Sequence, residues 1–110
     1  MKVAIFHPAA RSAIRSFPED VRREIGKAIF DLQKGAVLGM PLARTMPSVA
    51  AGVSELRMRD QRGIYRTFYY VSSPQGILIL HAFVKKSMET PKPEIELARK
   101  RLKELSHEES

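Results

Sequence analysis

The segment from residue 55 to residue 86 most constrains the fold, because it reads as three consecutive β-strands joined by tight turns. The turns, Asp60–Gly63 and Ser72–Gly76, each end in a glycine, which tolerates positive φ. Outside the turns, polar and apolar side chains alternate as strand geometry requires, and the last strand is apolar on both faces. We therefore expect strands over residues 53–59, 64–71 and 77–84.

Helical patterns lie on both sides of this segment. Pro8 can open a helix at its first position, and a short strand over residues 3–6 precedes it. A second helix begins near Pro18 and ends at Lys34–Gly35, because apolar residues recur between them at helical spacing. Thr90–Pro91 begins a last helix with the same apolar period. Its opposite face carries four cations that we expect in solvent: Arg99, Lys100, Arg101 and Lys103.

The element order β-α-α-β-β-β-α predicts an α+β fold. We expect a small, twisted, mainly antiparallel sheet with the N-terminal helical hairpin on one face and a C-terminal helix. At 110 residues, the chain is expected to form a single domain over residues 1–110. Residues 35–53 contain glycines and prolines without a clear period, which predicts a long loop of a kind that is often functional. Residues 106–110 are expected to form a frayed tail.

The composition narrows the functional classes. The formal net charge is +7, and the excess lies before residue 93. A basic domain attracts nucleic acid, acidic proteins or anionic membranes. The absence of cysteine excludes disulfides, thiolate metal sites and cysteine nucleophiles. No apolar run reaches about 18 residues, and the N-terminal apolar stretch is too short for a signal peptide, so we expect a cytoplasmic protein that has no membrane partner.

The strand segment places cations among apolar and aromatic residues. Arg57 and Arg59 share one face of their strand, and Arg66 lies across from them if the two strands pair through the turn. Lys85 and Lys86 close the last strand. Guanidinium groups on one face repel one another unless an anion lies among them, and the local acids are too few to neutralise five cations. We therefore predict an anion-binding surface. The alternative is pairing with the nearby acids or dispersal in solvent.

Aromatic residues share this face. Phe68 and Tyr70 have the same strand parity as Arg66, which would give unstacked RNA bases a platform beside phosphate contacts. Phe68 equally suits packing under the last helix, and packing is the favoured interpretation for it. The candidate acid/base residues are Tyr70 and His81, although a histidine in so apolar a strand is more often a core residue. The predicted RNA contacts are Arg62, Lys85 and Phe68. The histidines are scattered and no cofactor motif is present, so we expect neither metal nor cofactor.

A resemblance to the RelE/ParE toxin superfamily lies in four segments: Glu-Leu-Arg-Met-Arg at 55–59, Gly-Ile-Tyr-Arg-Thr-Phe-Tyr-Tyr at 63–70, Leu-His-Ala-Phe-Val-Lys-Lys at 80–86 and Thr-Pro-Lys-Pro-Glu-Ile-Glu-Leu-Ala-Arg at 90–99. The chain is most similar to the phage-derived, HigB-like toxins of type II toxin–antitoxin systems. The resemblance implies a metal-independent endoribonuclease that cuts mRNA in the ribosomal A site, with a helix-turn-helix antitoxin as its partner. It implies that the catalytic residues are Arg57, Arg59, Arg66 and Lys86.

The chain departs from RelE in two respects. It has arginine at 57 and 59 where RelE has lysine, and arginine stays protonated, which makes it a poor general base. It also lacks a counterpart of RelE's C-terminal catalytic tyrosine, so proton transfer would fall to Tyr65, Tyr69, Tyr70 or His81. The resemblance still implies in-line attack by a 2′-hydroxyl, with the cations stabilising the transition state. The alternatives are a ParE-like, non-nucleolytic inhibitor of DNA gyrase and a basic nucleic-acid-binding module without catalysis.

Overall fold

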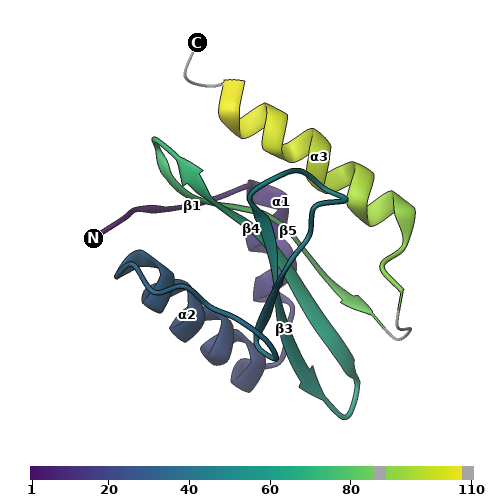
Figure 1. The fold of residues 1–110 in the computed structure, drawn as a ribbon. Coiled ribbons are helices and arrows are strands. Elements are labelled where there is room, and N and C mark those ends of the chain that lie inside the picture. Colours follow the sequence, from purple (N-terminus) through teal and green to yellow (C-terminus); the bar gives the residue numbers. More distant parts are fainter. Residues whose placement is uncertain (86–88, 108–110) are drawn as a thin grey trace.

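A five-stranded sheet organises the protein, and the computed structural model describes it over residues 1–85 and 89–107 (Figure 1). The strand order is β1-β5-β4-β3-β2, with β1 parallel to β5 and the other neighbours antiparallel. The elements are β1 Ala4–Phe6, α1 Pro8–Arg15, α2 Glu19–Gln33, β2 Ala43–Thr45, β3 Val53–Asp60, β4 Gly63–Ser73, β5 Gly76–Lys85 and α3 Lys92–His107. The predicted α+β fold and the order of its predicted elements are confirmed.

The helical hairpin covers one face of the sheet. Pro8 occupies the first turn of α1, and the N–H of Ala9 donates to His7 Nδ1 at 3.2 Å. Glu19 and Asp20 lie in the first turn of α2, where negative charge is favourable at the positive end of the helix dipole. The apolar stripe of α2 then packs on the sheet. The core on this face comprises Val21, Ile25, Ala28, Ile29 and Leu32 of α2 with Leu56, Met58, Tyr65, Tyr69, Ile77 and Ile79 of the strands.

Helix α3 covers only part of the other face. Ala98 and Leu105 pack over Phe68, Leu78 and Leu80, and the segment after β2 adds further apolar contacts. The end of the sheet nearest the β3–β4 turn extends beyond α3 (Figure 1). Side chains on this projecting end are therefore not covered by a helix.

The predicted loop over residues 35–53 is wrong in one part, because it contains β2. This strand pairs with Ser54–Leu56 of β3, and the backbone N–H of Arg57 donates to the carbonyl of Leu42 at 2.8 Å. Three residues are too few to show an alternating pattern, so the sequence carried no strand signal here. At the other end, α3 continues to His107, into the predicted tail, and residues 108–110 lie outside the described residues.

Strand β5 contains a bulge at Leu80. The pairing passes from Phe68 with His81 to Tyr69 with Ile79, so Leu80 is an extra residue on β5. A bulge places two residues opposite one and changes the alternation beyond it. Lys85 consequently pairs with Ile64 and lies on the α3 face of the sheet.

Candidate anion-binding site

The arginines of β3 and β4 gather on the face that α3 covers in part. Arg57 lies directly opposite Arg66, and Arg59 lies opposite Ile64, which in turn pairs with Lys85. Directly paired residues on neighbouring strands project from the same face of a sheet. The alternation in the sequence therefore gave the correct common face for the three arginines.

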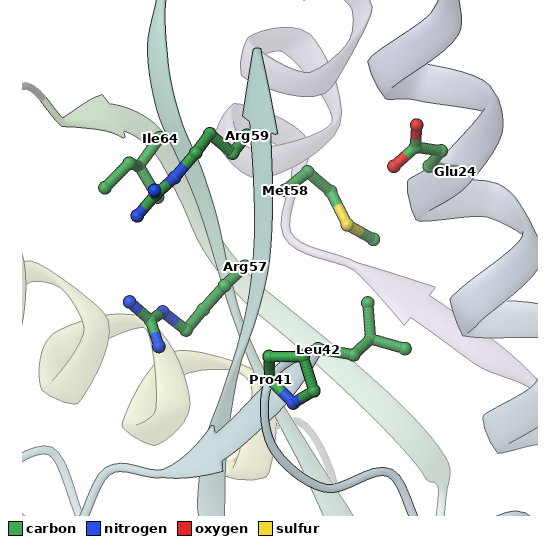
Figure 2. A pocket seen from close by; sticks show the side chains of 7 residues that line it. All are labelled: Glu24, Pro41, Leu42, Arg57, Met58, Arg59 and Ile64. Atoms are coloured by element: carbon green, nitrogen blue, oxygen red, sulfur yellow. The ribbon is translucent and has the colours of Figure 1, made fainter.

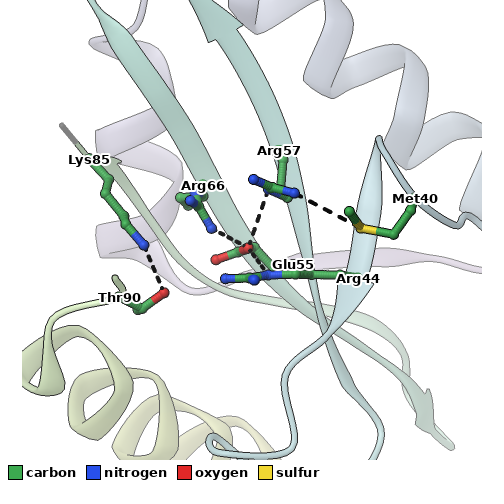
Figure 3. A network of polar contacts seen from close by, with 7 residues as sticks. All are labelled: Met40, Arg44, Glu55, Arg57, Arg66, Lys85 and Thr90. Carbon is green, nitrogen blue, oxygen red and sulfur yellow. Dashed lines mark hydrogen bonds and ion pairs between the residues drawn. The ribbon is translucent and has the colours of Figure 1, made fainter. Parts of the chain in front are cut away.

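Glu55 is the fully buried carboxylate at the centre of this group. Its Oε1 accepts a hydrogen bond from Arg66 Nη1 at 2.5 Å and another from Arg44 Nε at 2.9 Å. Arg57 Nε lies 3.9 Å from the same oxygen (Figure 3). Three adjacent strands thus direct three guanidinium groups at one carboxylate, which can neutralise only one of their charges.

The three arginines differ in exposure. The side chain of Arg66 is 1% exposed, that of Arg57 18% and that of Arg44 37%. Burial lowers the pKa of Arg66 below its usual value, and Glu55 opposes that shift. The resemblance implies that Arg66 is a catalytic residue, but the structure does not place its side chain where it could contact RNA. Its guanidinium group is covered and bound to Glu55, so Arg66 supports the surface from below.

Lys85 also lies beneath the surface. It is 3% exposed, and its Nζ donates to Thr90 Oγ1 at 3.3 Å. Burial lowers the pKa of Lys85, and the positive charge of Arg66 lowers it further. Lys86, the next residue and a member of the predicted catalytic set, lies outside the described residues.

Two adjoining cavities border the arginines. The larger cavity has a volume of about 410 Å³ and lies along the edge of β3, next to the residues that precede β2. Arg57 and Arg59 line it on one side of the strand, and Met58 lines it on the other (Figure 2). The smaller, of about 250 Å³, lies at the β3–β4 turn and is lined by Arg59, Arg62 and Lys85 among others. The cavities share Arg59 and Ile64. Arg59 and Arg62 are both exposed, so they can contact a ligand without rearrangement of the core.

Neither aromatic candidate lies open beside the arginines. Phe68 is fully buried under α3, with its ring centroid 5.5 Å from that of Phe83. The structure therefore corrects its predicted contact with RNA, because no ring face is available to a base. Tyr70 is half-buried, and its ring lies so close to Gly52 that a Cβ there would approach it to 2.9 Å. It is four residues from Arg66, or about 14 Å along the strand.

His81 forms a polar link between the sheet and α3. Arg101 Nη1 lies 2.8 Å from His81 Nδ1, and arginine can only donate, so Nδ1 is the acceptor. Nε2 then carries the proton and donates to Glu94 Oε1 at 3.1 Å. Burial lowers the pKa of His81, and Glu94 opposes the shift. This acid/base candidate is thus a neutral residue beneath α3. The expectation that Arg101 points into solvent is wrong.

The other two tyrosines lie on the opposite face. Tyr65 and Tyr69 are buried in the core beneath the helical hairpin. The hydroxyl of Tyr65 donates to Asp60 Oδ2 at 3.1 Å, and its pKa is raised by burial and by Asp60. Neither tyrosine shares a face with the arginines, so neither is placed to transfer a proton there.

Residues 1–85 and 89–107 contain neither a candidate metal site nor a candidate membrane-spanning helix. No group of three histidine, cysteine, aspartate or glutamate residues in this part of the chain could hold a metal ion. No helix in it is long and apolar enough to cross a membrane.

The comparisons with known proteins agree with the fold. The model of the family described as phage derived protein Gp49-like (DUF891) matches residues 12–103, most of the chain. The chain belongs to this family. No curated protein matches the sequence of this Gp49-like chain.

Two solved structures share its architecture. A chain of the RelBE2 toxin–antitoxin complex from Mycobacterium tuberculosis aligns with a TM-score of 0.54 at 17% identity, over 76% of the Gp49-like chain and 98% of that chain. A chain of the intact RelBE toxin–antitoxin complex from E. coli aligns with a TM-score of 0.51 at 14% identity, over 79% and 100% respectively. The predicted phage-derived family and the predicted RelE-like fold are thereby confirmed.

Arg44 is the one residue of the arginine group that sequence reasoning missed. It lies on β2, inside the predicted loop, where neither period nor motif singled it out. Only the pairing of Arg44 with Glu55 across two strands reveals its place in the site.

Proposed function

We propose that this chain is the toxin of a type II toxin–antitoxin system and that it cleaves ribosome-bound mRNA without a metal ion. The Gp49-like family and the fold shared with chains of RelBE complexes support the toxin assignment. The observation that carries the nuclease assignment is that three arginines share one carboxylate and that one of them, Arg57, lines a cavity together with the exposed Arg59. Such an excess of guanidinium groups suits a phosphodiester, whose oxygens accept from their N–H donors.

In the proposed reaction, the 2′-oxygen of one nucleotide attacks the adjacent phosphorus and the bond to the 5′-oxygen breaks. The products are a 2′,3′-cyclic phosphate and a 5′-hydroxyl end. Arg59 and the predicted Lys86 stabilise the extra negative charge of the transition state, where loss of one such donor typically costs about 2.7–4 kcal/mol. The proton of the 2′-hydroxyl passes to solvent.

Lys85 is the described residue best suited to protonate the leaving 5′-oxygen. Lys85 is 3% exposed, but unlike Arg66 it lines the cavity that contains Arg59 and Arg62, and its pKa is lowered by burial and by Arg66. A lowered pKa brings an ammonium group closer to the range in which proton donation is efficient. Arg57 orients the RNA backbone, and Glu55 with Arg66 holds the surrounding strands.

The proposed protein partner is a helix-turn-helix antitoxin that neutralises the toxin.

The test uses ribosomes programmed with a short synthetic mRNA, with cleavage mapped by primer extension. The wild-type protein is expected to cut the message, and Arg59→Gln to lower the rate about 100-fold, because it removes an exposed donor without disturbing the core. Arg22→Gln is the matched control, since Arg22 is an exposed arginine on α2, on the other side of the sheet. A 2′-deoxy nucleotide at the cleavage position should block the reaction.

Intact message at equimolar protein would contradict the nuclease proposal. Inhibition of gyrase supercoiling in that case would identify a ParE-like activity. Binding of RNA without cleavage or gyrase inhibition would leave a basic nucleic-acid-binding module.

A further inference from the structure

Arg44 has donors to spare at the edge of the sheet. It projects from β2 directly opposite Glu55, and its Nε donates to Glu55 Oε1 at 2.9 Å. Within residues 1–85 and 89–107, Glu55 is the only polar partner of its side chain. A guanidinium group has five N–H donors in a fixed fork, and that of Arg44 is 37% exposed. Its remaining donors can therefore reach a ligand while Nε stays bound to Glu55.

Arg57 is short of acceptors. Its Nε is buried and has no hydrogen-bond partner among the residues described, because Glu55 Oε1 lies 3.9 Å away. Its Nη1 has only the sulfur of Met40, at 3.9 Å, and a thioether is a weak acceptor. A buried donor without a partner costs about 1–3 kcal/mol. An anion beside Arg57 would remove that cost.

The register brings Arg44 and Arg57 to the same patch. Glu55 and Arg57 are two residues apart on β3 and project from one face, and Arg44 pairs with Glu55 on that face. Arg66, directly opposite Arg57, adds a like charge that is unfavourable without a counter-ion. Glu55 Oε1 lies within 4 Å of a guanidinium nitrogen of each of the three arginines, so it holds their side chains in position.

We propose that Arg44 and Arg57 form a phosphate subsite for single-stranded RNA, next to the Arg59 contact, with Glu55 as its positioning residue. The inference rests on the proposed function, since it assigns a second phosphate of the same RNA. Arg57 and Arg59 are two residues apart on one strand face, about 7 Å. Their spacing lets a single RNA strand contact both arginines through different phosphates. The Arg44–Arg57 subsite holds a phosphate that is not cleaved.

The experiment measures binding of a single-stranded RNA oligonucleotide that is fully 2′-O-methylated and therefore cannot be cleaved. Fluorescence anisotropy gives Kd at several KCl concentrations, and each phosphate contact to a single strand contributes about 0.7 to the slope of log Kd against log salt. Arg44→Gln is expected to lower that slope by about 0.7 and to weaken binding several-fold at low salt. The control Arg22→Gln should keep the wild-type slope.

Two further variants separate positioning from net charge. Glu55→Gln makes the protein more positive, so a plain charge effect would tighten RNA binding. Loss of positioning should instead weaken it in protein shown by circular dichroism to be folded. Arg44→Lys keeps the charge but loses the fork, and is expected to fall between wild type and Arg44→Gln.

Cleavage on ribosomes distinguishes this inference from the proposed function. Arg44→Gln should raise KM and leave kcat near the wild-type value, because its phosphate is remote from the broken bond. An unchanged salt slope in Arg44→Gln, with wild-type cleavage intact, would overturn the subsite and leave the nuclease standing. Tighter RNA binding by folded Glu55→Gln would overturn the role of Glu55. Wild-type protein that neither binds the oligonucleotide nor cleaves message would overturn both proposals.

Discussion

Two polar clusters lie on the same face of the sheet, and they differ in charge balance. Across β2, β3 and β4, three arginines share the single carboxylate of Glu55. Beneath α3, His81 accepts from one arginine, Arg101, and donates to one carboxylate, Glu94. The second cluster is balanced and covered, whereas the first is unbalanced and partly open.

The satisfaction of individual atoms follows the same division. In the arginine cluster, three buried atoms have no hydrogen-bond partner among the residues described: Glu55 Oε2, Arg57 Nε and Arg66 Nε. In the His81 cluster, both ring nitrogens have one. Buried polar groups without partners are uncommon in proteins and call for an explanation. The ratio of cations to acceptors therefore separates a candidate binding site from a structural link more clearly than the number of charges does.

The largest expected effect comes from removing the shared carboxylate. Glu55→Gln should lower the free energy of unfolding by about 3 kcal/mol, because it leaves buried guanidinium groups without their counter-ion. Glu94→Gln, the matched change in the other cluster, should cost about 1 kcal/mol, since the amide oxygen can still accept from His81 and only the negative charge of a partly exposed carboxylate is lost. Urea unfolding followed by circular dichroism measures both losses. Equal losses would remove the distinction between the clusters.

Substituting one arginine in each cluster should separate an effect on activity from an effect on stability. Arg57→Gln is expected to lower kcat/KM for RNA cleavage about 10- to 100-fold, the value of one charged hydrogen bond, with little change in stability. Arg101→Gln should lower the free energy of unfolding by about 1–3 kcal/mol, because buried His81 Nδ1 loses its donor. Its cleavage rate per folded molecule should match wild type. A nuclease defect in folded Arg101→Gln would assign a role in the reaction to the covered cluster.

The His81 cluster should also respond to acid. The pKa of His81 is lowered in the folded state by burial, so the unfolded chain binds more protons as the pH falls through about 6.5. Stability attributable to His81 is therefore complete above that pH and is lost below it, by at most about 1.4 kcal/mol per pH unit. Glu94, Arg101 and the nearby His7 are the charged or titratable groups that act on it.

The measurement is the free energy of unfolding between pH 5 and pH 8, compared between wild type and His81→Gln. The variant should show a flatter profile over the acidic half of that range. Parallel profiles would mean that His81 is not held neutral by the cluster.

The smallest expected effect concerns the buried aromatic between the clusters. Phe68→Leu should lower the free energy of unfolding by about 1 kcal/mol through lost packing under α3. The affinity for the uncleavable RNA should remain that of wild type, because no base can reach the ring. A fall in RNA affinity of more than about fivefold, with the fold intact, would restore Phe68 as a stacking platform.

Alternation and helical period were enough to predict most of the fold. The observed β3, β4 and β5 extend the predicted strands by at most two residues at either end, because one buried face imposes a period of two. Strand β2 escaped because three residues show no period. Arg101 was misplaced because its position on the polar side of α3 does not reveal that a long side chain reaches back to His81.

The candidate site was predictable in face but not in depth. Parity placed Arg57, Arg59 and Arg66 together, and nothing in the sequence distinguished the buried Arg66 from the exposed Arg59. The burial of each arginine depends on which part of the sheet α3 covers and on its contact with Glu55. Both are set by the tertiary structure. Arg44 required the register between β2 and β3, which no local pattern encodes.

Leu80 is one residue more on β5 than its pairing with β4 requires, and it shifts the alternation of side chains beyond it. Relative to strict alternation along the sequence, the residues after Leu80 occupy opposite faces of the sheet. Phe83 and Lys85 therefore lie on the face that carries the arginines, and Ala82 faces the helical hairpin. If Leu80 instead paired regularly within the ladder, the two sets would exchange faces and Lys85 would turn toward the helical hairpin. Deleting Leu80 alone would leave both sets on their present faces, because the residues on either side of it already pair in regular alternation.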